Sequence, residues 1–336
     1  MNTNSKVQEY RQDLLSGEWV IMSANRTARP NHFKVTRPQA TTNISEMVNP
    51  FLPIVTEQDT PEEIPMVVRD GRGQGVVYTV INKFPMVHME YPSKSLAEGP
   101  YTGHSAYGSH ELFVYRDPEL PVRDFSLKKM EHVFEAFQKR SLELMHSDGL
   151  NHIFIFHNHG EGGGASITHP HSQLIASPII PDGIERMLTG AAQYYKSHKR
   201  SLFAVMVNYE QEHKKRIIFE NDDMIALCPY ASRSAFEVEI IPKEHKPHFP
   251  FIVPSVRKSL AEAYKHVLQA YFRTLGDIDY NMYLYTAPCD GKPYEYFRWF
   301  IRISPKLSRL GGYETGADTD VCTVFPEQAA ETLRTN

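Results

Sequence analysis

The sequence is poor in the features that mark secreted, membrane-spanning or nucleic-acid-binding chains. It has only three cysteines in 336 residues, and Cys228, Cys289 and Cys322 are too far apart for a CxxC pair or a readable disulfide framework. No run of ~18 apolar residues occurs, and the polar start MNTNSKVQEYRQD has no apolar signal segment. A net charge of -4 and a pI near 6.5 argue against a nucleic-acid or anionic membrane partner. We therefore expect a cytoplasmic protein that binds neither nucleic acid nor membrane.

Composition and length bound the size of the folded unit. The chain is 41% hydrophobic and 23% charged, which is ordinary for a globular protein. At roughly 100–200 residues per domain, its length predicts two domains, or one large unit built of two halves.

The pattern of apolar residues repeats once along the chain. In the first half, after a long loop at 38–65, it predicts strands at 76–85, 110–118, 151–158 and 172–180, with a helix at 126–149. In the second half, the same order predicts a strand–turn–strand unit at 216–229, strands at 235–245, 281–288 and 296–305, and a helix at 253–277. Phe236 follows His110 by 126 residues and Leu284 follows Phe154 by 130, so the period of the repeat is near 128 residues. We predict an α+β fold of two similar units, residues 1–195 and 196–336.

The segment HNHGEGGGASITHPHSQL, residues 157–174, concentrates the residues suited to phosphate chemistry. Glycines at 160 and 162–164 let the backbone approach a ligand closely, and exposed N–H groups can hold phosphate oxygens. Ser166 adds a hydroxyl donor. We expect this loop to bind phosphate.

The histidines that follow the glycines suit nucleophilic attack on phosphorus. Pro170 fixes an extended conformation, so His169, His171 and then Gln173 are expected on one face of a strand. A neutral imidazole has a lone pair at neutral pH, and phosphoryl transfer needs mainly positioning and charge neutralisation. Taken alone, a His-x-His pair is more often structural or metal-binding, and a glycine run is a common loop. Their combination within 16 residues favours catalysis.

In this order, residues 158–173 resemble the active-site segment of galactose-1-phosphate uridylyltransferases and related nucleotidyltransferases of the histidine-triad superfamily. The resemblance extends to SANRTARPNHF (23–33), VINKFP (80–85) and SRLGGYE (308–314). It implies a fold of two tandem histidine-triad-like units, each an antiparallel half-barrel sheet with helices.

The resemblance also implies a double-displacement mechanism. His171 would attack UDP-glucose, release glucose 1-phosphate, and pass the uridylyl group from the covalent intermediate to galactose 1-phosphate. Gln173 would hold the phosphoryl oxygens, and His169 would orient its neighbour or bind metal. The resemblance further assigns the leaving phosphate to Ser166, Gly164 and Ala165, the nucleotide and phosphate side to Asn158, Asn82, Arg26 and Arg29, and the hexose side to Tyr313 and Glu314.

The chain departs from the family at the positions of its metal ligands. Many members carry a zinc-binding C-x-x-C pair where this chain has NPFL (49–52), and an H-x-H pair where it has Phe300 and Arg302. With those donors missing, we expect no tightly bound structural metal and no cofactor. The alternative is an unusual site assembled from His110, His157, His159 and His169. The lysine that precedes G-Y-E in the family is also absent, with Ser308 and Arg309 in its region.

Several alternatives stay open on the sequence. The HPHSQL segment resembles ADP-glucose phosphorylase-like members equally well, which transfer an adenylyl group to inorganic phosphate. Dinucleoside-polyphosphate phosphorolysis or hydrolysis, and nucleotide binding without catalysis, are further readings. The family implies a homodimer in which the partner's Tyr313 and Glu314 help complete the site. Trp299 and Phe300 are expected in the core.

Overall fold

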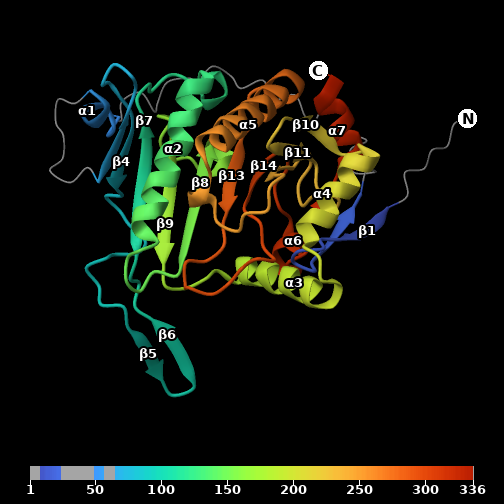
Figure 1. Cartoon of the computed structure of the whole chain (residues 1–336), viewed down its shortest axis with the longest axis horizontal. Coiled ribbons are helices and arrows are strands. Elements are labelled where there is room, and N and C mark those ends of the chain that lie inside the picture. Colours follow the sequence, from blue (N-terminus) through green and yellow to red (C-terminus); the bar gives the residue numbers. More distant parts are fainter. Residues whose placement is uncertain (1–7, 24–48, 57–64, 336) are drawn as a thin grey trace, which may run out of the picture.

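A computed structural model describes residues 8–23, 49–56 and 65–335, and its centre is a ten-stranded antiparallel sheet (Figure 1). The strands lie in the order β10 (Ile217–Glu220), β11 (Met224–Leu227), β12 (Val238–Pro242), β14 (Phe300–Pro305), β13 (Tyr280–Tyr285), β8 (His152–His159), β9 (His171–Ser177), β7 (Ser109–Tyr115), β4 (Gly75–Ile81) and β3 (Met66–Arg69). The α+β class is confirmed, and the predicted strands appear with ends shifted by a few residues.

Both halves of the sheet are built in the same order. In each, three strands precede a long helix and two strands follow it, the helices being α2 (Leu127–Leu144) and α5 (Pro254–Leu275). The halves meet where β8 pairs with β13. The expected boundary after residue 195 falls within helix α3 (Asp182–His198), and the division into two half-barrel units stays a prediction.

Alternate residues along the strands give the sheet its two faces. One face packs against α2 and α5 in a single large core that includes Phe113, Phe134, Ile155, Val267 and Trp299. Ser126 caps the start of α2, with its side chain accepting a hydrogen bond from the Lys129 N–H at 3.1 Å. Both Trp299 and Phe300 are fully buried, which confirms their place in the core.

Among the described residues, other elements cover the opposite face only at its two ends. Over the second half, α3 and α4 (Leu202–His213) pack on apolar side chains of β11, β12 and β14. Over the first half, the short helix α1 (Leu52–Val55) packs on β4 and β7, within a segment that the sequence predicted as a loop. Between these covers lie β9, β8 and β13, where Gln173, Phe156, Asn158 and Tyr283 are half-buried. This uncovered middle carries the candidate site.

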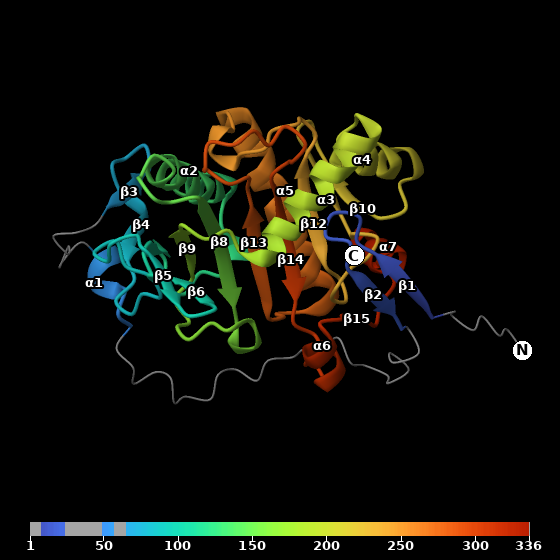
Figure 2. The same ribbon diagram turned by 90° about the horizontal axis from the view of Figure 1, so that it is seen from below.

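Smaller elements surround the sheet. They are the sheet of β1 (Glu9–Gln12), β2 (Trp19–Met22) and β15 (Val321–Cys322), the hairpin of β5 (Ser95–Glu98) and β6 (Tyr101–His104), and helices α6 (Gly312–Ala317) and α7 (Pro326–Thr335). The hairpin projects from the body in Figure 1, and Figure 2 shows α6 beyond the end of β14. Across the described ranges, we find no helix with the length and apolar character needed to span a bilayer.

Two buried histidines predict a loss of stability in acid. Burial lowers the pKa of His152 to about 4 and that of His157 to about 3. Because the unfolded chain titrates near pH 6.5, it takes up protons first as the pH falls, so stability is full above pH 6.5 and declines below it. Together the two should cost roughly 2–3 kcal/mol per pH unit near pH 5.

Urea unfolding of the wild type and of His152→Phe at pH 7.5 and pH 5.0 measures this slope. The variant should lose about half of it, since phenylalanine fills the site without titrating. An equal acid slope in both proteins would show that His152 does not contribute.

Candidate functional site

His171 and Gln173 point to the uncovered face of the sheet, and Ser172 points to the helix-covered core. The Ser172 hydroxyl lies 2.5 Å from the hydroxyl of Tyr115 in that core. The strand registers set Gln173 beside Phe156 of β8 and His171 beside Val114 of β7. The alternation therefore places the two predicted residues on one face, as expected.

The His171 ring is held in one tautomer. Its Nδ1 lies 2.9 Å from the backbone oxygen of His169, and because a carbonyl only accepts, Nδ1 carries the proton. This leaves the Nε2 lone pair without a hydrogen-bond partner among the described residues. Burial lowers the pKa of His171, so the ring is neutral at pH 7. A neutral, oriented imidazole with an available Nε2 is the form that can act as a nucleophile.

Both ring nitrogens of His169 have hydrogen-bond partners within the protein. Its Nε2–H donates to the Tyr115 backbone oxygen at 2.5 Å, and its Nδ1 accepts from the Asn49 side-chain amide at 2.9 Å. Both histidine rings contact Phe51 edge-on, with centroids 5.5 and 5.2 Å away. His169 thus orients His171 through its backbone carbonyl. The Asn49 amide occupies the His169 Nδ1 lone pair that a metal ion would need.

Gln173 is oriented by His110, which the sequence suggested only as a possible metal ligand. The Met86 N–H donates to His110 Nδ1 at 3.1 Å, which leaves the proton of the neutral ring on Nε2. That Nε2 lies 2.9 Å from Gln173 Oε1, so the Gln173 carbonyl must face His110. Burial lowers the pKa of His110 and keeps this tautomer neutral. The NH2 group of Gln173 is therefore directed away from His110 as a donor.

The glycine loop uses most of its own backbone donors. The N–H groups of Gly163, Gly164 and Ala165 donate to carbonyls at the start of the loop, at 2.9–3.1 Å. The Gly162 N–H donates to Asp279 Oδ2 at 2.7 Å. The Ser166 N–H and hydroxyl have no acceptor among the described residues. In this conformation, a phosphate would be held from Ser166 onwards, and Gly164 and Ala165 would shape the loop.

The second half of the chain anchors this loop. The Asn281 side-chain amide on β13 donates to Asn158 Oδ1 at 2.8 Å and to the Gly163 carbonyl at 2.6 Å. Its own oxygen accepts from the Tyr283 hydroxyl at 3.2 Å, which fixes the amide orientation. A Cβ atom on Gly163 would lie 2.8 Å from the Tyr280 backbone oxygen, so only glycine allows this approach. The NH2 group of Asn158 donates to the Gly164 carbonyl at 3.4 Å, and its second hydrogen has no acceptor among the described residues.

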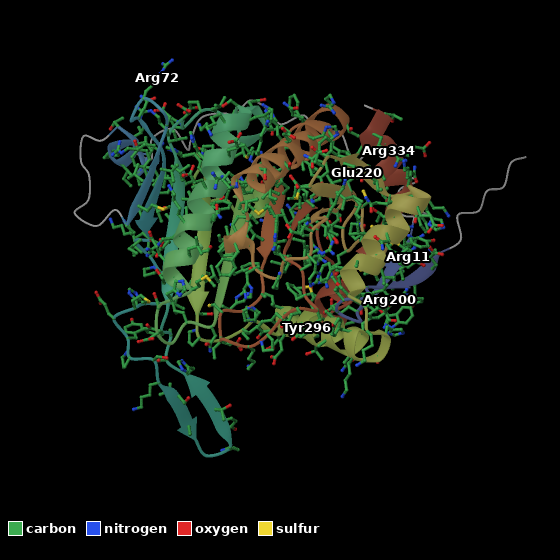
Figure 3. All side chains as sticks on the ribbon, viewed as in Figure 1. Arg11, Arg72, Arg200, Glu220, Tyr296 and Arg334 are labelled. Carbon is green, nitrogen blue, oxygen red and sulfur yellow. The ribbon has the colours of Figure 1, made fainter. Side chains whose placement is uncertain are left out.

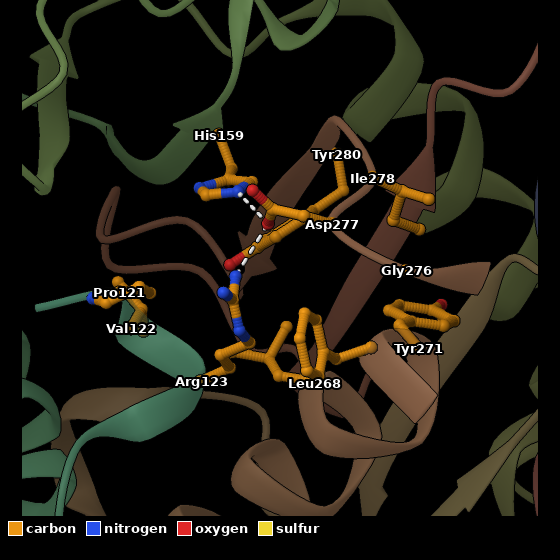
Figure 4. Close-up of a pocket in the computed structure, with 11 residues that line it drawn as sticks. Pro121, Val122, Arg123, His159, Leu268, Tyr271, Gly276, Asp277, Ile278 and Tyr280 are labelled. Carbon is orange, nitrogen blue, oxygen red and sulfur yellow. Dashed lines mark hydrogen bonds and ion pairs between the residues drawn. The ribbon is translucent and has the colours of Figure 1, made fainter. Parts of the chain in front are cut away.

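Asp277 bridges Arg123 and His159 next to the start of the glycine loop. Asp277 Oδ1 accepts from Arg123 Nη1 at 2.6 Å and lies 3.2 Å from His159 Nε2 (Figure 4). The His159 ring stacks on Tyr280, with centroids 4.9 Å apart. These contacts therefore hold the His159 ring in place directly before the glycine loop.

Comparisons with known proteins place the chain in a family. The family model for galactose-1-phosphate uridyl transferase, N-terminal domain, matches residues 1–181. An ADP-glucose phosphorylase of Arabidopsis thaliana is 30% identical, over 97% of this chain and 92% of its own length. The chain belongs to the galactose-1-phosphate uridyl transferase family.

Two further relatives support the family over the full length. A galactose-1-phosphate uridylyltransferase of Thermotoga maritima is 28% identical over 98% of both chains. The solved structure of a GalT-like protein from Arabidopsis thaliana superposes with a TM-score of 0.81 at 25% identity, covering 98% of each chain. The relatives are enzymes of the nucleotidyltransferase and phosphorylase kind.

The remaining predicted residues lie in three places. Asn82 follows β4, and its backbone N–H donates to the His110 carbonyl at 2.9 Å, so it lies beside the group around Gln173. Tyr313 is 55% exposed on α6, and Glu314 accepts from the Gly311 N–H at the start of that helix. Arg26 and Arg29 lie outside the described residues.

The alternative metal site does not assemble. The rings of His110, His157, His159 and His169 bind Gln173, the His171 carbonyl, Asp277 and Asn49 respectively. Within residues 8–23, 49–56 and 65–335, no three His, Cys, Asp or Glu side chains are grouped for a metal ion. The residues present do not fit the family's zinc.

Proposed function

We propose that the protein transfers a nucleotidyl group from a nucleoside-diphosphate sugar through a covalent intermediate on His171. The observation that carries the proposal is the fixed His171 tautomer, which presents Nε2 on the uncovered face beside the directed amide of Gln173. Membership of the family supplies the reaction class. The donor we propose first is UDP-glucose and the acceptor is galactose 1-phosphate.

The chemistry requires two displacements at one phosphorus. In the first, His171 Nε2 forms a bond to the α-phosphorus while the bond to the sugar phosphate oxygen breaks, and glucose 1-phosphate leaves with the electron pair. In the second, a phosphate oxygen of the acceptor attacks the same phosphorus, and the N–P pair returns to Nε2. The His169 carbonyl on Nδ1–H stabilises the positive ring of the intermediate.

Neighbouring side chains supply the donors that such a transition state needs. The Gln173 amide and the Ser166 N–H and hydroxyl bind phosphoryl oxygens. Asn158 donates to them from strand β8. By family resemblance, Arg26 and Arg29 add positive charge, and Asn82 contacts the nucleoside. Tyr313 and Glu314 contact the hexose from the partner chain of a homodimer, in keeping with the exposure of α6.

A second candidate is phosphorolysis of ADP-glucose, supported by the 30% identity to the Arabidopsis enzyme of that name. The same His171 intermediate would carry an adenylyl group, and inorganic phosphate would be the acceptor.

A matrix of donors and acceptors tests the proposal and separates the candidates. UDP-glucose and ADP-glucose are each incubated with galactose 1-phosphate or inorganic phosphate, and products are followed by chromatography. Turnover only with UDP-glucose and galactose 1-phosphate supports the first candidate, and turnover only with ADP-glucose and phosphate supports the second. Isotope exchange of labelled glucose 1-phosphate into the donor, without acceptor, must accompany either. Steady hydrolysis without exchange, or no turnover, contradicts the double displacement.

The Asn281 anchor predicts a loss of activity from a residue outside the reacting atoms. Asn281→Ala removes the two hydrogen bonds that hold Asn158 and Gly163, so the loop should lose its fixed position. We expect kcat/KM to fall by roughly 10- to 100-fold, and stability by about 1–2 kcal/mol. Steady-state kinetics and urea unfolding measure the two effects.

The matched control is Asn208→Ala, because Asn208 is exposed on α4. It should leave both quantities unchanged. Wild-type kcat/KM in Asn281→Ala would show that the loop does not depend on β13.

A further inference from the structure

A cavity separate from the candidate site lies over the second half of the sheet. Its volume is about 420 Å³, and it is enclosed by the turn after β1, helix α4, the end of β11 and strand β12. Leu14, Met206 and Leu227 contribute apolar walls, and Tyr209 and Tyr230 contribute rings. A cavity of this size with mostly apolar walls and a few polar groups is typical of small-molecule sites.

Glu239 gives this cavity a buried carboxyl group that is paired through only one of its two oxygens. The residue is only 2% exposed, and its Oε1 accepts from both Nε and Nη2 of Arg302, at 3.0 and 2.7 Å. Its Oε2 accepts no hydrogen bond within the described part of the chain, yet it is not among the fully enclosed atoms. Because Glu239 lines the cavity and Arg302 takes Oε1, we infer that Oε2 is the oxygen available to a ligand there. A buried carboxylate oxygen without a donor is costly unless a ligand supplies one.

The other charges around the cavity add to its negative character. Asp13, Glu210 and Glu239 line it, against one guanidinium, that of Arg216. Arg216 is already paired with Glu210 and with Glu327, at 2.5 and 2.6 Å.

The guanidiniums beyond the lining are paired as well. Arg11, labelled on β1 in Figure 3, binds Glu9 and Glu327, and Arg233 binds Glu18. Arg302 pairs with Glu239 through Oε1 only, so none of these guanidiniums hydrogen-bonds to Glu239 Oε2.

We propose that this cavity binds a compact organic amine, a cation with an apolar aliphatic or aromatic body. The ammonium N–H groups would donate to Glu239 Oε2, and Asp13 would add attraction. The apolar body would fill the space between α4 and β11. A neutral ligand of the same shape would leave the carboxylate unpaired, and an anion would be repelled.

Three indole compounds of matched shape test the proposal on the full chain. Tryptamine, tryptophol and indole-3-propionate differ in carrying a cationic, neutral or anionic end, and calorimetric titration at pH 7.5 measures their affinities. We expect tryptamine to bind at least tenfold more tightly than tryptophol, and indole-3-propionate not to bind. Equal affinity for tryptamine and tryptophol, or no binding of tryptamine, would overturn the proposal.

Two variants locate the binding. Met206→Trp fills the cavity and should abolish tryptamine binding, whereas Met89→Trp, at an exposed position, should not. Glu239→Gln keeps the acceptor for Arg302 but removes the charge, so tryptamine should bind at least tenfold more weakly while tryptophol is unaffected. Undiminished tryptamine affinity in Met206→Trp would place the ligand elsewhere and refute the site. Because turnover is not the readout, the outcome is independent of the proposed reaction.

Discussion

Replacing His171 by alanine is expected to lower nucleotidyl transfer by about 10^4-fold or more. The reason is specific: the imidazole Nε2 forms the bond to phosphorus, and among the described residues no other unpaired nucleophile lies on that part of the sheet. The residual rate would come from water attacking the α-phosphorus of a donor held by the remaining hydrogen-bond donors of the site. Product formation with a saturating donor and acceptor measures the loss.

The control for this substitution is His213→Ala, which removes an exposed imidazole at the end of α4. It should retain wild-type activity. Circular dichroism should show that His171→Ala is folded, since the strand hydrogen bonds of β9 do not involve the ring. A variant that kept more than about 1% of wild-type turnover would require another nucleophile.

The second large effect is expected at Gln173 and at the histidine that orients it. Gln173→Ala should lower kcat by about 10²–10³-fold, because a donor aimed at the developing phosphoryl charge is lost. His110→Phe should lower kcat by roughly 10- to 100-fold with little change in KM, since the Gln173 amide remains but can rotate. Steady-state kinetics of the two single variants measure both effects.

The double variant separates positioning from a general structural role. If His110 acts through Gln173, adding His110→Phe to Gln173→Ala should cost little further activity. Independent, multiplicative losses in the double variant would show that His110 contributes elsewhere, and the orientation argument would fail.

Patterns that repeat along the chain could be predicted well. The spacing of Leu127, Met130 and Val133 predicted α2, and the alternation around Pro170 placed His171 and Gln173 on one face. The repeat was also visible, although its register was not. Spacing paired Leu284 with Phe154, but Leu284 faces the α2–α5 core and Phe154 faces the opposite side. A shift of one residue reverses the face, and weak similarity cannot fix it.

Side-chain pairs between distant segments could not be predicted. The His110–Gln173 contact joins residues 63 apart, and the Asn281–Asn158 contact joins residues 123 apart. Asn49 was noted only as a missing metal ligand, whereas it occupies the lone pair of His169. Such contacts depend on sheet register and on amide orientation, which local propensity does not encode. The uncovered middle of the sheet could not be predicted either, because it depends on where α1, α3 and α4 pack.

The central claim is a covalent nucleotidyl group on His171, and intact mass measurement tests it most directly. The protein is mixed with UDP-glucose or ADP-glucose in the absence of acceptor, and its mass is recorded before and after acid treatment. The account predicts an acid-labile gain of one UMP or AMP unit, lost on adding the matching acceptor, located on His171 by peptide mapping and absent from His171→Ala. No adduct with either donor, or an adduct that persists in His171→Ala, would contradict it.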